Sequence, residues 1–220
     1  LHRLIRRQRQ MCIRDSSFRG HAYSRAGVAA FTTSTGYGIA KYDNPEELSV
    51  SDRNNIGYQY TDCPLYWISV IYLNFAEAKA EMGSLTQDDL NNSINKLQAR
   101  AGLPAMTTTP DADPANNMGV SNLIWEIRRC RRCELIMDNW YRYWDLIRWH
   151  QLDKLDSTKY PNTMLGANVS NVPDCEEATK NGYIDASDAQ IRTYEAKHYF
   201  YPIPTTQLTL NKNMKQNPGW

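Results

Sequence analysis

The sequence predicts a mostly α-helical protein, built from a tetratricopeptide-type helical pair and one long helix that are joined by extended irregular loops. Apolar residues recur at three- and four-residue steps in three segments, at residues 65–82, 86–101 and 121–152. The first two segments together span about 36 residues, which matches the size of a tetratricopeptide unit. The stretches between helices are rich in Gly, Pro, Ser, Asn and Thr, which favour turns and loops.

The helical pair has clear boundary signals. Its first helix is followed by Gly83, a residue suited to the left-handed position after a helix end. Its second helix is predicted to begin at Thr86, where Asp89 completes a capping-box pattern, and to end before Gly102. Because a single helical pair cannot bury its own faces, its partners are expected to be the long helix or sequence absent from this chain.

The third segment is the most aromatic part of the chain. We expect one continuous helix from Ser121, a suitable N-cap, to about Leu152. Trp and Tyr cover most faces of its C-terminal half, so this half is expected to be buried among other helices. Charges there need partners, and Arg142, Asp145 and Arg148 are spaced to pair along one face.

The remaining segments are expected to hold little regular structure. Residues 17–64 are predicted to be irregular, and residues 153–196 to form a long surface excursion with brief turns. Two prolines then favour an extended run, residues 205–210 are expected to turn briefly, and residues 216–220 to close the chain as a Pro-Gly turn.

Composition and charge exclude several classes of protein. Hydrophobic residues make up 41% of the chain, the mean hydropathy is −0.64, and no run approaches the roughly 18 to 20 apolar residues of a membrane-spanning helix. The net charge is +1, but residues 17–220 hold 20 basic and 23 acidic residues, a net charge of −3, which argues against nucleic-acid binding. Five cysteines at scattered spacings do not form a disulfide framework.

Residues 1–16 differ from the rest of the chain. They are rich in Arg but lack the apolar stretch and small-residue cleavage site of a secretory signal, and they show no core-facing pattern. We interpret residues 1–16 as a leader foreign to the fold, with a genuine basic arm as the alternative.

No catalytic residue is predicted. The chain lacks the nucleophile-elbow, phosphate-loop, zinc-protease and dinucleotide-binding motifs, and its four histidines are scattered. Asp138 and Asp145 would share one face of the predicted long helix, but roughly 10 Å apart, beyond the usual spacing of paired glycosidase carboxylates. Neighbouring Arg142 and Arg148 would also keep Asp145 ionised, which is unsuited to a general acid.

Two further patterns have structural interpretations. Cys130 and Cys133 resemble half a zinc or redox motif, but a second ligand pair is missing, so we predict core packing and neither metal nor cofactor. The arginines within residues 128–132 are flanked by Glu126 and Glu134, which favours a solvated or internally ion-paired helix face over a nucleic-acid patch. Tyrosine-rich loops before residue 64 could stack on sugar rings, but such loops are too common to assign a site.

Several motifs, in order, resemble the C-terminal half of the SusD/RagB family. They are YLNFAEAKAEMG (72–83), NKLQARAGLP (95–104), RYWDLIRW (142–149) after Glu134, YPIPTTQL (201–208) and terminal QNPGW (216–220). The resemblance covers roughly residues 36–220. Within these motifs we assign the following family-signature residues to structure: Glu77, Arg100, Gly102, Glu134, Arg142, Asp145, Arg148, Trp149, Pro202, Pro204, Asn217, Pro218 and Gly219.

The resemblance implies a surface-exposed outer-membrane lipoprotein that captures glycans or other nutrients without catalysis. Its implied partner is a SusC-like TonB-dependent transporter, and its implied fold is mostly helical with tetratricopeptide-like repeats. Residues 17–220 would be the C-terminal part of such a domain, with the lipid anchor and signal peptide outside this chain. A glycan-active hydrolase is the alternative function. Ligand contacts in the family lie largely outside the matched motifs, so no carbohydrate-binding residue is carried over.

The chain departs from the family pattern at three places. Trp67 and Val70 stand where the family often has Arg and Glu, so apolar packing is expected to replace a charge pair there. Cys130 stands where Glu is common. Asp138 and Asn139 replace a usual Glu-Gly pair, with one extra residue before the RYWDLIRW motif.

Deletion of residues 1–16 is expected to leave the thermal midpoint of the protein unchanged, because these residues show no core-facing pattern. Thermal denaturation of the truncated and intact chains checks this, and a fall of several degrees would contradict it.

Overall fold

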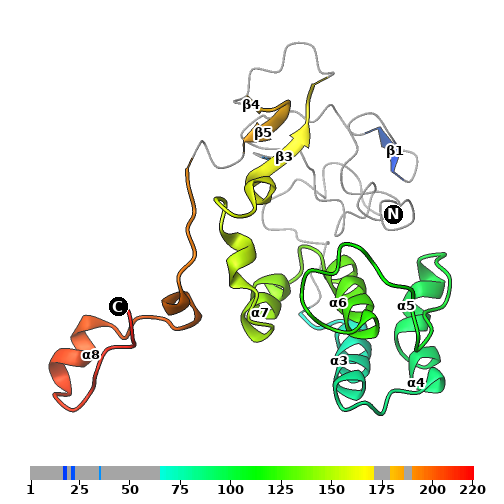
Figure 1. Cartoon of the computed structure of the whole chain (residues 1–220), viewed down its shortest axis with the longest axis horizontal. Coiled ribbons are helices and arrows are strands. Elements are labelled where there is room, and N and C mark those ends of the chain that lie inside the picture. The colour runs from blue at the N-terminus through cyan, green and yellow to red at the C-terminus, as the bar shows by residue number, and fades with distance from the viewer. Residues whose placement is uncertain (1–16, 19–20, 23–34, 36–64, 171–178, 186–189) are drawn as a thin grey trace, which may run out of the picture. The chain divides into compact units, whose positions relative to one another are not determined.

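The computed structural model describes residues 17–18, 21–22, 35, 65–170, 179–185 and 190–220 (Figure 1). The chain divides into two compact units, residues 1–142 and 143–220. Helices dominate the described part, which confirms the mostly α-helical prediction. The predicted leader and the tyrosine-rich loops before residue 64 lie outside the described residues.

The described part of the first unit comprises two short paired strands and several helices. In chain order its described elements are β1 (Ser17–Phe18), β2 (His21–Ala22), α3 (Ile68–Glu81), α4 (Gln87–Asn91), α5 (Ile94–Arg100) and α6 (Asn122–Glu134). Strands β1 and β2 pair antiparallel. Helix α7 (Tyr141–Arg148) crosses the boundary between the units. The second unit continues with η1 (Leu152–Leu155), η2 (Pro161–Met164), β3 (Leu165–Asn168), β4 (Thr179–Lys180), β5 (Tyr183–Asp185), η3 (Ala196–Tyr199) and α8 (Thr205–Leu210).

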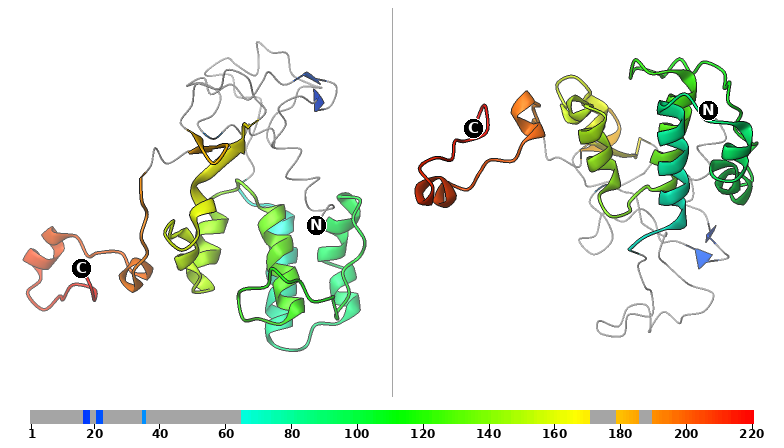
Figure 2. Two further views of the ribbon diagram at one scale, coloured as in Figure 1. Left: turned by 45° about the horizontal axis from the view of Figure 1, so that its top comes forward. Right: turned by 90° about the horizontal axis from the view of Figure 1, so that it is seen from below.

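The core of the first unit lies where α3 packs along α6 and against α5 (Figures 1 and 2). Leu73, Ile94 and Ile127 are fully buried there, and burial of each such side chain stabilises the fold by about 1.5 to 3 kcal/mol. Val70 belongs to this core and Trp67 packs against it. Apolar packing therefore occupies these two positions, as the sequence predicts.

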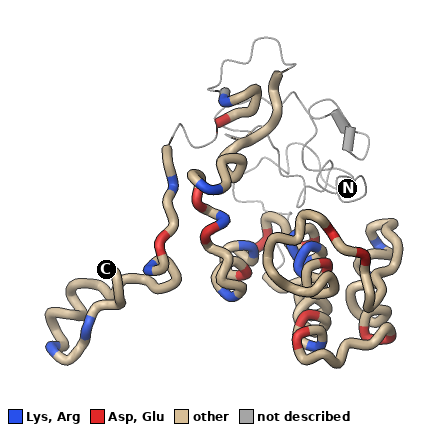
Figure 3. The backbone as a smooth tube through the Cα atoms, viewed as in Figure 1, with Lys and Arg blue, Asp and Glu red and all other residues tan. Residues whose placement is uncertain are grey.

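Charged side chains also join α3 and α6, whose acidic and basic residues can be followed in Figure 3. The Arg128 guanidinium lies 3.3 Å from the Glu77 carboxylate and 3.0 Å from that of Glu81. Arg131 donates to the side-chain oxygen of Asn74 at 2.7 Å. Because Glu77 and Arg128 are both largely removed from solvent, their pairing avoids an uncompensated buried charge.

The predicted glycine caps are confirmed. Gly83 has a φ of 67°, its N–H donates to the Ala80 carbonyl, and the Ser84 N–H donates to the Lys79 carbonyl, both at 3.0 Å. This is the Schellman arrangement, in which two otherwise unpaired helix carbonyls are satisfied. Gly102, with a φ of 66°, ends α5 in the same way.

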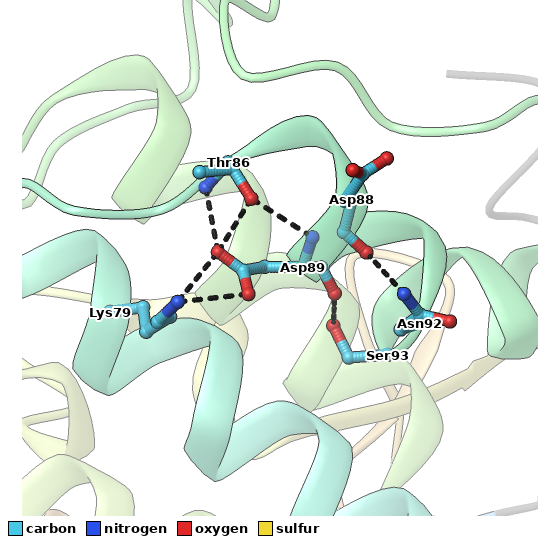
Figure 4. A network of polar contacts seen from close by, with 6 residues as sticks. All are labelled: Lys79, Thr86, Asp88, Asp89, Asn92 and Ser93. Atoms are coloured by element: carbon cyan, nitrogen blue, oxygen red, sulfur yellow. Dashed lines mark hydrogen bonds and ion pairs between the residues drawn. The ribbon is translucent and has the colours of Figure 1, made fainter.

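The predicted second helix is wrong in one respect, because it is broken into α4 and α5. The Asn92 side-chain amide donates to the Asp88 carbonyl at 3.0 Å, and the Ser93 hydroxyl donates to the Asp89 carbonyl at 2.5 Å (Figure 4). Such side-chain bonds compete with the backbone bonds that would continue the helix. The predicted capping box at Thr86 and Asp89 is confirmed.

The predicted long helix is also wrong, since α6 ends at Glu134 and α7 begins only at Tyr141. Between them Met137, Asn139 and Trp140 have φ values of 62°, 34° and 59°, a left-handed conformation that no α-helix contains. The Asn139 side-chain amide donates to the Leu65 carbonyl at 2.7 Å, and this bond joins the α6–α7 loop to the residues just before α3. The predicted N-cap at Ser121 is confirmed.

A small sheet was not predicted within residues 153–196. Its strand order is β3-β5-β4, with both pairings antiparallel, and Ile184 of β5 is buried. Asn181 and Gly182 form the two-residue turn between β4 and β5, with φ values of 54° and 80°. Asn-Gly is the preferred pair for such hairpin turns, so this dipeptide was the available sequence signal.

Replacing Thr86 with Ala is expected to destabilise the first unit by roughly 0.5 to 2 kcal/mol, because the Thr86 hydroxyl accepts from the Asp89 N–H. Denaturant unfolding measures the change. Thr107→Ala, at an exposed loop position, is the control and should stay within about 0.5 kcal/mol of the unaltered protein. Equal effects of the two variants would contradict the capping role.

Candidate functional site

The signature residues of the first unit make contacts inside that unit. Glu77 and Glu134 are buried, and they pair with Arg128 and Arg100 respectively. Gly102 occupies the left-handed position after α5. These contacts agree with a structural role for Glu77, Arg100, Gly102 and Glu134, which stays a prediction.

The signature residues in and just after α7 include one buried carboxylate, that of Asp145. Asp145 is 3% exposed and accepts from the Arg148 Nε at 2.9 Å, so this predicted pairing is present. The Arg148 guanidinium also lies 4.6 Å from the centre of the buried Trp149 ring. Arg142 is half-buried in the first turn of the helix.

The comparison of Asp138 with Asp145 needs correction. The helix break separates the two residues, so they do not lie on one face of a continuous helix. The spacing of roughly 10 Å, which was calculated from the rise of a continuous helix, therefore does not apply. Both side chains are buried, at 2% and 3% exposure. Neither carboxylate is therefore presented on the protein surface as an acid or base for a bulky substrate.

The last residues of the chain hold the segment around Pro202 and Pro204. The Ile203 N–H donates to the Gln216 side-chain oxygen at 2.8 Å, and the Gln216 amide donates to the Ile203 carbonyl at 2.9 Å. The Asn217 side-chain amide donates to the Tyr201 carbonyl at 2.6 Å. The motifs YPIPTTQL and QNPGW are thus joined by hydrogen bonds.

The closing turn of the chain, at Pro218 and Gly219, returns Trp220 to η3. Gly219 has a φ of 87°, and a Cβ atom there would lie 2.9 Å from the Lys197 Cβ, so both conformation and space favour glycine. The Trp220 indole N–H donates to the carbonyls of Lys197 and Phe200.

Asp156 connects two distant segments of the second unit. Its carboxylate accepts from the Thr158 hydroxyl at 2.5 Å and from the Tyr194 N–H at 3.1 Å. These bonds, that from Thr158 first, lower the pKa of the Asp156 carboxyl to about 2. The ionised side chain therefore fixes the segment that leads to η3.

Metal and nucleic-acid chemistry find no support in the described residues. Within them no group of three or more His, Cys, Asp and Glu side chains is placed to hold a metal ion. Cys130 packs against the core and accepts weakly from the Gln98 amide at 3.8 Å, which confirms its packing role. Arg128 and Arg129 are ion-paired with acidic side chains, which confirms the internally paired interpretation of the arginine run.

A small hollow of about 200 Å³ lies beside the sheet of the second unit. Its lining includes Ser157, Thr158, Met164, Lys180, Asp185 and Gln190. Ligand pockets usually enclose about 300 to 1,000 Å³ and use aromatic walls, whereas none of the described residues that line this hollow is aromatic. We do not assign it a ligand.

A more suitable feature is a group of aromatic rings, namely half-buried Tyr143 and exposed Trp144 of α7 together with exposed Tyr201. We call these three residues the aromatic surface. The rings of Tyr143 and Trp144 meet edge to face with centres 5.6 Å apart, and the hydroxyls of Tyr143 and Tyr201 lie 3.4 Å apart. Trp144 is 53% exposed and Tyr201 is 64% exposed. Flat apolar faces and hydrogen-bonding edges are thus presented together.

The Tyr143 hydroxyl of the aromatic surface stays protonated at neutral pH. The hydrogen bond with Tyr201 raises the pKa of Tyr143 above its ordinary value of 10.0. A protonated phenol both donates and accepts hydrogen bonds, so this edge can bind a ligand rich in hydroxyl groups.

The sequence pattern did not reveal the aromatic surface, because it predicts that Tyr143 and Trp144 are buried and assigns Tyr201 only to an extended run. Along α7 only Asp145 and Leu146 are buried, followed by Trp149, whereas Trp144 and Trp140 are exposed. The expectation that this aromatic stretch is buried among helices is therefore wrong in part. The physical reason is that the helix break leaves a short α7 with one buried face.

No helix within the described residues is both long and apolar enough to cross a membrane. The model of the SusD family matches residues 17–220. Among solved structures, the chain is similar to a SusD-like protein from Bacteroides fragilis NCTC 9343, with 23% sequence identity and a TM-score of 0.54. This match covers 86% of the present chain and 31% of the other chain, so the chain spans about a third of that relative. Comparison with curated proteins found no match.

The pH dependence of stability tests the role of Asp156. Its folded pKa of about 2 lies below the ordinary value of 3.8, so its contribution to stability is present above about pH 4 and is lost as the pH falls toward 2. Asp156→Asn is expected to lessen the fall in the free energy of unfolding between pH 4 and pH 2.

The change will be partial, because Asp89 in the first unit also has its pKa lowered to about 2. Thr158→Ala should act in the same direction as Asp156→Asn, since it removes the leading cause of the shift. An acid profile as steep in Asp156→Asn as in the unaltered protein would contradict the assignment.

Proposed function

This chain belongs to the SusD family, and we propose that it captures glycans at the outer-membrane surface for a SusC-like TonB-dependent transporter. The single observation that carries the proposal is the family match over residues 17–220. In this proposal residues 17–220 are the C-terminal part of a larger SusD-like domain, and attachment to the membrane is through an N-terminal lipid outside them.

We propose the aromatic surface as the part of this chain that contacts glycan. The apolar C–H face of a sugar ring can stack on Trp144 or Tyr201, while its hydroxyls exchange hydrogen bonds with the phenol groups of Tyr143 and Tyr201. Asn217 holds the backbone of Tyr201 and the Tyr143 hydroxyl contacts its phenol group, so less ordering of this residue is needed on binding. The preformed arrangement supports binding to glycans.

The proposed function is binding without catalysis. A glycan-active hydrolase is the alternative, and it would need two carboxylates that reach the glycosidic bond. The acidic pair singled out in the sequence, Asp138 and Asp145, is buried on either side of a helix break. This geometry favours the binding function over the hydrolase.

Isothermal titration of the complete gene product against plant, host and microbial glycans tests the proposal. Trp144→Ala and Tyr201→Ala are each expected to weaken binding by about fivefold or more, since loss of a central aromatic contact commonly costs more than about 1 kcal/mol. Tyr183→Ala is the control, because Tyr183 is partly exposed on β5 and lies outside the aromatic surface. It should leave the affinity unchanged.

The 220-residue chain itself is expected to bind glycans weakly or not at all, because a sugar site needs several groups held rigidly together. Chromatography of the incubated glycans should detect no released sugar. Release of sugar by either protein would support the hydrolase alternative. Unchanged affinity in both aromatic variants would show that the aromatic surface does not contact glycan.

A further inference from the structure

Positive charge is concentrated in the last residues of the chain. Residues 17–195 hold 17 basic and 23 acidic residues, a net charge of −6, whereas residues 196–220 hold three lysines and no acidic residue, a net charge of +3. In Figure 3 the tube from α8 to the C-terminus carries blue segments and no red ones. The same segment contains Tyr201, so the basic part of the chain includes one ring of the aromatic surface.

Two of the three lysines have no acidic partner. Lys197 pairs with Glu195 at 3.2 Å, so its charge is balanced. Lys212 and Lys215 are exposed, and neither forms an ion pair in the part of the chain that the structure describes. The positive charge of these two side chains is therefore available to a ligand.

Lys212 lies in a tight turn that follows α8. The Met214 N–H donates to the Asn211 carbonyl at 2.9 Å, and the Asn213 N–H donates to the Asn211 side-chain oxygen at 3.1 Å. Asparagine is favoured at the start of such turns because its side chain forms this second bond. The backbone of Lys212 is thus held in place, and only its side chain must be ordered when a ligand binds.

Lys215 is connected to the aromatic surface through the two residues that follow it. Gln216 bonds to both backbone groups of Ile203, and the Asn217 amide donates to the Tyr201 carbonyl at 2.6 Å. Lys215 and Asn217 are two residues apart, so their Cα atoms are separated by at most about 7 Å. The ammonium group of Lys215, on its long flexible side chain, can therefore reach a ligand that extends past Tyr201.

The α7 side of the aromatic surface presents no exposed negative charge. Asp145, the acidic residue of α7, is buried and accepts from Arg148 at 2.9 Å. Arg148 follows Trp144 by four residues, so the two are neighbours on the helix, and the Arg148 side chain is 43% exposed. Every exposed charged side chain of α7 and of residues 200–220 is therefore basic.

We propose that the glycan captured at the aromatic surface is anionic, with carboxylate or sulfate groups that pair with Lys212 and Lys215. This inference rests on the proposed function, because it names the ligand class of the same site. One sugar ring stacks on Tyr201 or Trp144, while an anionic group further along the glycan meets an ammonium group. Lysine suits either anion, since its ammonium is a compact charge with three rotatable donors.

A single-stranded nucleic acid also combines negative charge with rings that stack on aromatic side chains. Its phosphate backbone is bound through many Lys and Arg contacts, whereas residues 196–220 offer two lysines without an acidic partner. The net charge of −6 over residues 17–195 would repel the rest of a long nucleic acid. These charges favour a glycan with spaced anionic groups.

Isothermal titration of the complete gene product with matched glycans tests the proposal. One arm compares polygalacturonate, alginate and hyaluronate with the same polymers after carboxyl reduction. A second arm compares carrageenan and dextran sulfate with their desulfated forms, and neutral starch and mannan complete the panel. At least one charged polymer is expected to bind about fivefold or more tightly than its neutral form, and the arm in which it occurs identifies the anion.

The double variant Lys212→Gln/Lys215→Gln separates charge from aromatic stacking, because glutamine keeps a polar side chain without the charge. It should weaken binding of the charged polymer by about fivefold or more and should keep the thermal midpoint of the unaltered protein. Raising NaCl from about 0.05 to 0.5 M should weaken binding by the unaltered protein more than binding by the double variant. Lys180→Gln, exposed on β4, is the matched control and should leave the affinity unchanged.

The failure of this inference differs from the failure of the proposed function. Equal affinity for charged and neutral forms, or equal effects of the double variant and Lys180→Gln, would overturn the anionic specificity while glycan capture stands. Binding of none of the polymers would contradict glycan capture itself, and this inference with it. Binding of single-stranded DNA as tight as that of the charged glycans would assign the two lysines to nucleic acid and overturn the proposal.

Discussion

The packing of α3 on α6 is the contact on which the rest of the first unit depends. It buries Leu73 and Ile127 and surrounds the Glu77 carboxylate with protein, so the same interface must supply that carboxylate with a cation. Arg128 does so and at the same time pairs with Glu81 one turn further along α3. Apolar area provides the driving force, while the buried Glu77 carboxylate favours the helix register in which Arg128 is its partner.

This interface also explains why the outer face of α3 stays exposed. With α5 and α6 on its inner side and its polar flanks already bonded, the helix has no described neighbour for its outer row of large apolar side chains. The same sequence property, an apolar residue at almost every third or fourth position on two faces, thus produces both the core of this unit and its open surface.

In the second unit, polar contacts between segments that are distant in the sequence hold the chain in place more than a large core does. Asp156 fixes the segment that leads to η3, and the Trp220 indole donates to the Phe200 carbonyl directly after η3. Gln216 and Asn217 then hold the next residues in an extended form. Tyr201 is thereby placed with its hydroxyl beside that of Tyr143. The QNPGW motif therefore positions one ring of the proposed glycan contact.

Local signals in the sequence determined the mostly helical class, the caps at Thr86 and Ser121, and the left-handed ends at Gly83 and Gly102, because each depends on bonds within a few residues. The family was also recognisable, since its motifs are local strings. The break between α6 and α7 was decided by tertiary structure, because Asn139 is fastened to Leu65, far away in the chain. The exposure of Trp144 was decided in the same way. The sequence shows that apolar residues lie on two faces of the helix, but only the packed structure shows which of the two faces is covered.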